Sequence, residues 1–283
     1  MIFFEISAFA GMTTTYIFIG ILGLFIGSFL NVLADRLSKE QSIGGRSKCD
    51  TCKHILAWYD LIPIISFTLL KGKCRYCKAS IAFGHVYSEI ITGVLFILTW
   101  HLSNQLYGLI QFHILHLVIT SILIVMLLSD IRYQIIPDEM QIALGLVAIV
   151  KFFLLTINPY TSIVTQIFTI EFLSQIAQFI GGGIIVMLPL LAIFLITKGK
   201  GMGFGDVKLT FNMGLLLGLW SGLYALYLGF ISGGLAGALI LLTKRGKLKS
   251  KIAFGPFLIL GTYIVLFYAY EVGELLQKIY GFR

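Results

Sequence analysis

The stretch Gly201–Lys208 reads Gly-Met-Gly-Phe-Gly-Asp-Val-Lys and separates two apolar runs, Ile184–Thr197 and Leu209–Leu219. Glycine tolerates positive φ and lets another chain approach the backbone closely. A carboxylate beside lipid is costly unless a partner or a task holds it there, which makes Asp206 a candidate functional residue. The alternative is a glycine-rich turn in which Asp206 caps the next helix and Lys208 faces lipid headgroups.

The composition on either side of this stretch is that of a membrane protein. The 283 residues are 58% hydrophobic and 12% charged, against about 25% charged in soluble domains. A membrane helix needs roughly 20 apolar residues, so we predict an all-α polytopic protein with eight spans. The spans are expected at about 16–34, 86–102, 111–129, 139–157, 173–197, 209–220, 222–243 and 255–276. The sixth is short, and its separation from the seventh is weak because Gly218–Gly222 carries no charge.

The basic residues predict the orientation of these spans. With the N-terminus outside, all but Lys151, Lys278 and Arg283 of the 21 Lys and Arg residues fall in loops on the inner side. This bias explains the net charge of +8 without a nucleic-acid partner. A seven-span arrangement would place the basic loop Lys244–Lys251 outside, against the rule. The first fifteen residues hold no Lys or Arg, so we expect residues 1–35 to be a retained anchor.

The second predicted segment, residues 36–85, is an inner loop that holds all four cysteines of the chain. They form two C-x-x-C pairs, Cys49 with Cys52 and Cys74 with Cys77, a spacing typical of a tetrathiolate zinc site. Two disulfides are the alternative, but they rarely persist on the reducing side that this loop is expected to face. Four protein ligands would leave no open position, so the zinc is expected to be structural.

The third predicted segment, residues 86–283, holds a second acidic cluster at the same membrane edge. Asp130 ends the third span, where the helix dipole opposes a carboxylate, whereas Asp138 opens the fourth, where capping explains an acid. Asp130 is therefore the expected partner of Asp206. Such a pair predicts aspartyl chemistry, in which one carboxylate takes a proton from water and the other donates one to the scissile carbonyl. Signatures of serine hydrolases and zincins, G-x-S-x-G and H-E-x-x-H, are absent from the sequence.

Taken in order, four segments resemble the type IV prepilin leader peptidases, which are GxGD membrane aspartyl proteases. They are Gly27–Val32, the two C-x-x-C pairs flanking Trp58–Pro63, Asp130–Asp138 and Gly203–Lys208. The resemblance implies cleavage of the basic leader of prepilin-like precursors at the cytoplasmic face of the inner membrane. It also implies, in bifunctional members, N-methylation of the new terminus with S-adenosylmethionine. Carried over by position, Asp130 and Asp206 are the catalytic pair, and the supporting loop residues are Gly203, Gly205, Lys208, Pro137 and Asp138.

Two departures fall in the part of the family associated with methyl transfer. Phe83–Glu89 replaces an Arg-Tyr-Pro-like pattern, and Ser38 stands where proline is usual. The sequence also lacks a Rossmann-type glycine motif for the methyl donor. Methylation is therefore implied by the resemblance alone, and no residue is assigned to bind S-adenosylmethionine.

Two other function classes remain open at this point. One is a secondary transporter that uses Asp130 and Asp206 as ion-coupling carboxylates. Against it, both acids are predicted at a membrane edge, whereas coupling sites lie near the midplane. The other is a non-catalytic assembly platform with a zinc-stabilised loop. Cleavage of a prepilin-like precursor distinguishes the peptidase from both.

Overall fold

The computed structural model describes residues 2–156, 169–243 and 253–281. Within these ranges the regular structure is entirely helical, apart from two isolated β-bridges in the cysteine loop, so the predicted all-α class is confirmed. The chain divides into two compact units, Met1–Leu128 and Ser129–Arg283. The predicted basic loop Lys244–Lys251 lies outside the described residues.

The first unit consists of two long packed helices, a loop with two short helices, and most of a third long helix. Its elements are α1 (Ile2–Ser38), η1 (Trp58–Leu61), α2 (Ile65–Leu69), α3 (Gly84–Leu106) and most of α4 (Ile110–Tyr133). Small residues let α1 cross α3 closely, because a Cβ on Gly23 would lie 2.8 Å from the Cα of Gly93. The buried Asn31 of α1 adds a hydrogen bond from its amide to Ser88 of α3.

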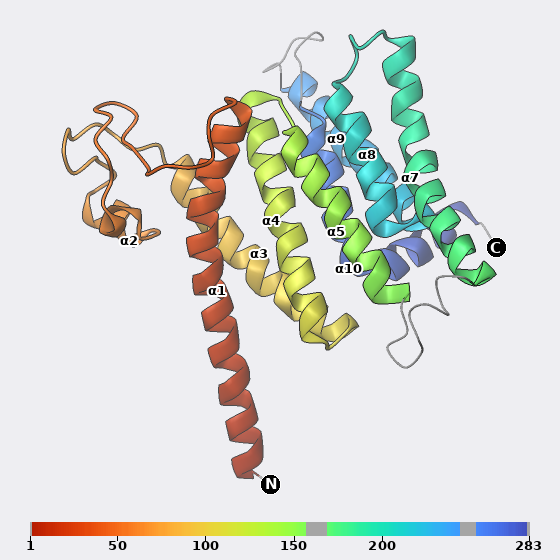
Figure 1. Cartoon of the computed structure of the whole chain (residues 1–283), viewed down its shortest axis with the longest axis horizontal. Coiled ribbons are helices and arrows are strands. Elements are labelled where there is room, and N and C mark those ends of the chain that lie inside the picture. The colour runs from red at the N-terminus through yellow and green to blue at the C-terminus, as the bar shows by residue number, and fades with distance from the viewer. Residues whose placement is uncertain (1, 157–168, 244–252, 282–283) are drawn as a thin grey trace. The chain divides into compact units, whose positions relative to one another are not determined.

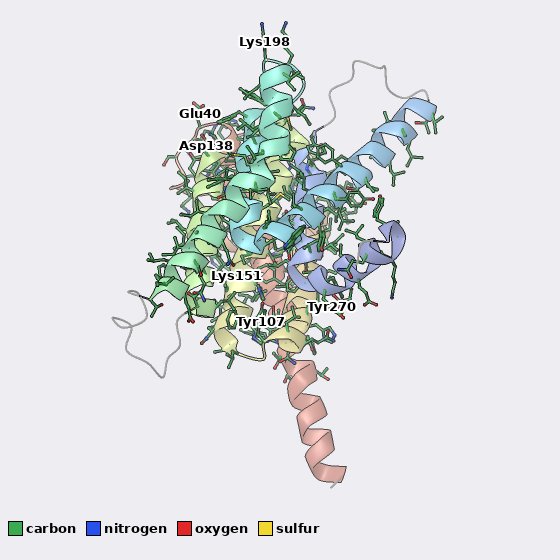
Figure 2. The ribbon with its side chains drawn as sticks, turned by 90° about the vertical axis from the view of Figure 1, so that its right-hand side faces the viewer. Glu40, Tyr107, Asp138, Lys151, Lys198 and Tyr270 are labelled. Carbon is green, nitrogen blue, oxygen red and sulfur yellow. The ribbon has the colours of Figure 1, made fainter. Side chains whose placement is uncertain are left out.

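The second unit is a helical bundle around a short central helix (Figure 1). Besides the last residues of α4, it contains α5 (Asp138–Thr156), α7 (Ile170–Ile196), α8 (Phe204–Leu217), α9 (Leu219–Leu242) and α10 (Gly255–Tyr280). The central helix α8 packs against α5, α7, α9 and α10. In Figure 2, Asp138 and Lys198 lie toward one end of this unit, and Lys151 lies toward the other.

Seven of the described helices are long and apolar enough to cross a membrane, which confirms a multi-pass membrane protein. The remaining predicted span corresponds to α8, which has 14 residues and is therefore about 21 Å long. A bilayer core is about 30 Å thick, so α8 is too short to cross it. It ends at Gly218, whose φ of 81° belongs to the left-handed region, and α9 begins at the next residue. The weak boundary between the sixth and seventh predicted spans therefore lies at Gly218.

Candidate functional sites

The two predicted catalytic carboxylates lie at the same end of the second unit. Asp130 belongs to the last turn of α4 and Asp206 to the first turn of α8, and both side chains are buried. Asp206 precedes the apolar run of α8 and lies outside the seven long spans. Burial, and after it the negative charge of Asp130, raises the pKa of Asp206 to about 7. The fold thus brings the two acids within electrostatic reach of each other.

Gly255, the first residue of α10, lies directly against Asp130. A Cβ at this position would overlap Oδ2 of Asp130, so a larger residue here would displace the Asp130 carboxylate. Among the described residues, this buried oxygen has no hydrogen-bond partner. A buried carboxylate oxygen without a partner is costly, and a shared proton or a water molecule would relieve that cost. The Gly-Pro pair that opens α10 is visible in the sequence, but the sequence alone indicated no role for Gly255.

The remaining loop residues expected at the site surround Asp206 and the start of α5. Gly203 is the N-cap of α8. The alternative in which Asp206 caps this helix is therefore wrong. A Cβ on Gly205 would lie 3.4 Å from the Cβ of Ile136, which precedes the buried Pro137. The loop before α5 therefore lies within van der Waals reach of the first turn of α8.

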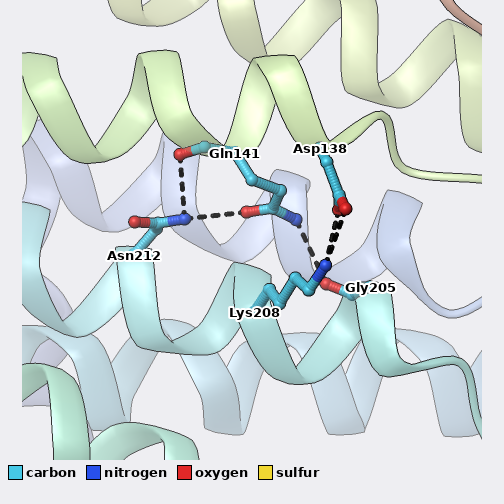
Figure 3. Close-up of polar contacts among 5 residues, drawn as sticks. All are labelled: Asp138, Gln141, Gly205, Lys208 and Asn212. Atoms are coloured by element: carbon cyan, nitrogen blue, oxygen red, sulfur yellow. Dashed lines mark hydrogen bonds and ion pairs between the residues drawn. The ribbon is translucent and has the colours of Figure 1, made fainter.

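Lys208, the other residue of that alternative, forms an ion pair. Its ammonium group donates to both carboxylate oxygens of Asp138, at 2.7 and 2.8 Å (Figure 3). The Asp138 side chain is 66% exposed and that of Lys208 is 37% exposed. Asp138 is therefore the solvated acid of this loop, and Asp130 is the buried one.

The four cysteines form two equivalent turns in the loop of the first unit. In each turn the N–H of the lysine after the second cysteine donates to the carbonyl of the first, from Lys53 to Cys49 and from Lys78 to Cys74. Both lysines have positive φ, 58° and 60°, and each turn is closed by an isolated bridge. Local sequence alone thus builds two turns of the same shape.

The cysteine sulfurs fit a single tetrahedral metal ion. All four cysteines are free thiols, and their Sγ atoms lie within 4.8 Å of one another. Zinc at about 2.3 Å from each sulfur would hold the sulfurs about 3.8 Å apart, and the Cys49–Cys77 separation is 3.8 Å. The backbone N–H groups of Cys52 and Thr51 lower the pKa of the Cys49 thiol to about 7. The pKa of the Cys77 thiol is raised to about 11: its backbone bond with Ala79 lowers it, but burial and bonds to the other three cysteines outweigh that effect. The structure thus gathers the four predicted cysteines into one cluster that could hold a metal ion, and metal binding itself stays a prediction.

Comparison with known proteins covers both units. Residues 21–102 match the bacterial peptidase A24 N-terminal domain, and residues 117–242 match the type IV leader peptidase family. A protein of Bacillus subtilis (strain 168), named prepilin leader peptidase/N-methyltransferase, is 31% identical over 252 residues, which cover 88% of this chain and 92% of that protein. The chain belongs to the type IV leader peptidase family. The predicted family and enzyme class are therefore confirmed.

Further members of the type IV leader peptidase family carry the same name. A Pseudomonas aeruginosa protein is 28% identical over 93% of both chains. A Myxococcus xanthus protein is 29% identical over 80% of this chain, which corresponds to 63% of that protein. No solved structure matches the chain. None of these relatives supports the transporter alternative.

This leader peptidase also has a cavity of about 920 Å³ in its first unit. The cavity is bounded by the end of α1, the cysteine loop and the start of α3. Glu89 of α3 lines it and accepts a hydrogen bond from the N–H of Ile64 at 3.0 Å. The nearly buried carboxylate of Asp60 ties the short helix η1 to the second cysteine turn through Arg75, at 2.7 Å. Glu89 and Asp60 therefore connect the loop to the helices, a role that the sequence did not reveal.

Proposed function

We propose that the chain is an aspartyl endopeptidase that removes the basic leader of type IV prepilin-like precursors, with Asp130 and Asp206 as its catalytic pair. The observation that carries this proposal is the burial of both acids at one end of the second unit, where the charge of Asp130 acts on Asp206. The substrate class comes from the names of the relatives. The assignment of the two acids comes from their position in the family resemblance and from this geometry.

The proposed chemistry needs one proton shared between the two carboxylates. Two close carboxylates cannot both ionise easily, so the pair retains a proton near neutral pH. The ionised carboxylate takes a proton from water as the water oxygen attacks the scissile carbonyl. The protonated carboxylic acid donates its proton to the carbonyl oxygen, which gives a neutral tetrahedral intermediate. Collapse of that intermediate then breaks the C–N bond, with a proton passing to the leaving amine.

The surrounding loops have supporting roles in this proposal. Gly255 leaves room for the Asp130 carboxylate, Gly205 lies against Ile136, and Gly203 begins the helix that carries Asp206. Pro137 and the Asp138–Lys208 ion pair hold the start of α5 near the start of α8. Neither Asp138 nor Lys208 is proposed to react.

The orientation and location follow from the charge pattern. We place the N-terminus outside the inner membrane and the carboxylate pair at the cytoplasmic face, because the loops before α3, α5 and α8 are basic whether or not α8 crosses the bilayer. The start of α10 lies against Asp130, which places the end of the loop after α9 at the same end of the unit. A precursor whose apolar helix is embedded in lipid would present its leader at this level. Membrane lipid is thus an expected partner, and a nucleic acid is not.

The same proposal includes N-methylation of the new terminus, an activity named in the relatives. S-adenosylmethionine would supply the methyl group. The 920 Å³ cavity of the first unit is within the size range of small-molecule sites, about 300–1,000 Å³, and we propose it as the donor site. Cys49, Cys52, Cys74 and Cys77 would hold a structural zinc ion that stiffens the cavity wall.

Incubation of the purified chain in lipid vesicles with a prepilin-like precursor tests both halves. Mass spectrometry should show a product that lacks the leader, and with S-adenosylmethionine added, a product heavier by one methyl group. An Asp206→Asn variant purified in parallel controls for contaminating proteases. A wild-type protein that leaves the precursor intact would overturn the proposed peptidase. A product that is cleaved but never methylated would overturn only the methyltransferase half.

A further inference from the structure

Helices α5 and α8 run parallel and are joined by polar bonds along their length. Residues early in α5 bond to residues early in α8, and a residue late in α5 bonds to one late in α8. The N-terminal ends of the two helices therefore lie at the same end of the unit, as Figure 3 shows for their first turns. The connections, in order, are Asp138 to Lys208, Gln141 to both Gly205 and Asn212, and Lys151 to the carbonyl of Leu216.

The other long contact of α8, with α7, is of a different kind. It is made by glycines, since a Cβ on Gly214 would overlap the carbonyl oxygen of Gly182. Phe211 and Leu215 of α8 also pack against Gly183 of α7, so this contact is close and apolar. Apolar packing is not directional, so it specifies the displacement of α8 along its own axis less sharply than hydrogen bonds do. The polar bonds to α5 can specify that displacement.

The middle connection is the buried one. Gln141 and Asn212 are 4% and 7% exposed. The amide of Gln141 donates to the Gly205 carbonyl at 3.1 Å, and its Oε1 accepts from the amide of Asn212 at 2.8 Å. A second bond, at 3.1 Å, runs from the Asn212 amide to the backbone carbonyl of Gln141. A shift of α8 by one turn, about 5.4 Å, would break all three bonds and leave buried polar groups unpaired.

This connection acts directly on the residue next to the proposed catalytic acid. The Gly205 carbonyl belongs to the peptide group that joins Gly205 to Asp206 (Figure 3). A hydrogen bond that orients this peptide group therefore also orients the backbone from which the Asp206 side chain projects.

We propose that Gln141 and Asn212 are positioning residues that fix the register of α8 along α5 and so hold Asp206 beside Asp130. The proposal rests on the aspartyl peptidase function above. It assigns neither residue a contact with the substrate. Their task is to keep two acids from different helices at the same level.

Replacement of Gln141 by leucine tests the positioning role. Gln141→Leu leaves the Gly205 carbonyl and the Asn212 amide without this partner, and we expect kcat for precursor cleavage to fall about 10–100-fold. KM should stay within about threefold because no substrate contact is lost. Asn212→Leu should lower kcat by a similar factor. The double variant should have a kcat only slightly lower than either single variant, since the two residues act as one unit. Thr210→Val is the matched control, because this buried hydroxyl bonds only within α8, to the Val207 carbonyl.

Gln141→Glu separates positioning from a general loss of stability. A protonated glutamic acid can donate to the Gly205 carbonyl and accept from Asn212, as glutamine does, whereas the ionised form cannot donate. The cleavage rate of Gln141→Glu divided by that of the wild type should therefore rise at least tenfold as pH falls through the glutamate pKa. Taking this ratio removes the pH dependence that the two proteins have in common.

The outcomes are distinguishable. The proposal is supported if kcat falls in Gln141→Leu but not in Thr210→Val, and if the cleavage rate of Gln141→Glu relative to the wild type rises at low pH. It is overturned if Gln141→Leu cleaves at the wild-type rate, if Thr210→Val loses as much, or if the Gln141→Glu ratio does not change with pH. Should Gln141→Leu fail to fold, the Gln141→Glu ratio decides. A wild-type protein without cleavage would instead overturn the proposed function and, with it, this inference.

Discussion

The cysteine cluster and the carboxylate pair are assembled in opposite ways. The cysteines lie on two short turns whose bonds join residues four or five positions apart, and two of the cysteines are exposed. The carboxylates lie on two different helices, are buried, and depend on Ile136, Gly255 and Gln141 from other segments. A site built from local turns can tolerate movement elsewhere in the chain, because its ligands move together. In a site built across helices, the relative position of the side chains depends on how the helices pack.

The largest expected effect comes from removing either buried acid. Asp130→Asn and Asp206→Asn should each lower precursor cleavage by about 10²–10⁴-fold, because the pair loses the group that accepts or donates the proton. The cysteine cluster should keep its metal in both variants, since it lies in the other unit. The measurement is the cleavage rate of each purified variant, together with its metal content and melting temperature. A fully active Asp130→Asn enzyme would remove Asp130 from the pair.

The second effect should be confined to the cysteine cluster. Cys74→Ser should lower the zinc content from about one equivalent and impair methyl transfer, because a four-thiolate site loses one ligand. Leader cleavage should stay within a few-fold of the wild type, since both acids belong to the second unit. Metal analysis and the mass of the cleaved product check both statements. Equal loss of cleavage and methylation in folded protein would show that the two sites are not independent.

The third effect is a pH dependence of cleavage. The raised pKa of Asp206, about 7, means that the carboxylate pair holds one proton below this pH and loses it above. With both acids ionised, neither can donate to the scissile carbonyl, so the rate should fall up to tenfold per pH unit above about 7. Initial rates between pH 5 and 9 check this. An increase in rate over the range from 7 to 9 would contradict the shared proton.

The smallest effect is expected at the exposed acid of the same loop. Asp138→Asn should keep substantial activity, since asparagine also stabilises helix N-termini and an exposed ion pair contributes about 0–1 kcal/mol. The melting temperature should change by only a few degrees. Lys208→Gln, which breaks the same ion pair from the other side, is the matched control. An inactive but well-folded Asp138→Asn protein would transfer the catalytic role from Asp130 to Asp138.

Several features of this protein follow from the sequence alone. Composition and hydropathy identify a polytopic helical membrane protein, because lipid requires long apolar segments whose backbone bonds are satisfied internally. The two C-x-x-C pairs predict the metal cluster, because four ligands on two short turns need little help from the rest of the fold. The helix-dipole argument predicts Asp130 as the partner of Asp206, and the structure buries both.

Other features were decided only by the tertiary structure. Gly255 lies against Asp130, Lys208 binds Asp138, and Gln141 reaches both Gly205 and Asn212. The bonds that Gln141 makes with Gly205 and Asn212 join residues 64 and 71 positions apart. Hydrophobic periodicity indicates which residues are helical, but it does not specify how far one helix is displaced along another. That displacement depends on side-chain packing and paired polar groups at the crossing, and we propose that it holds the two carboxylates together.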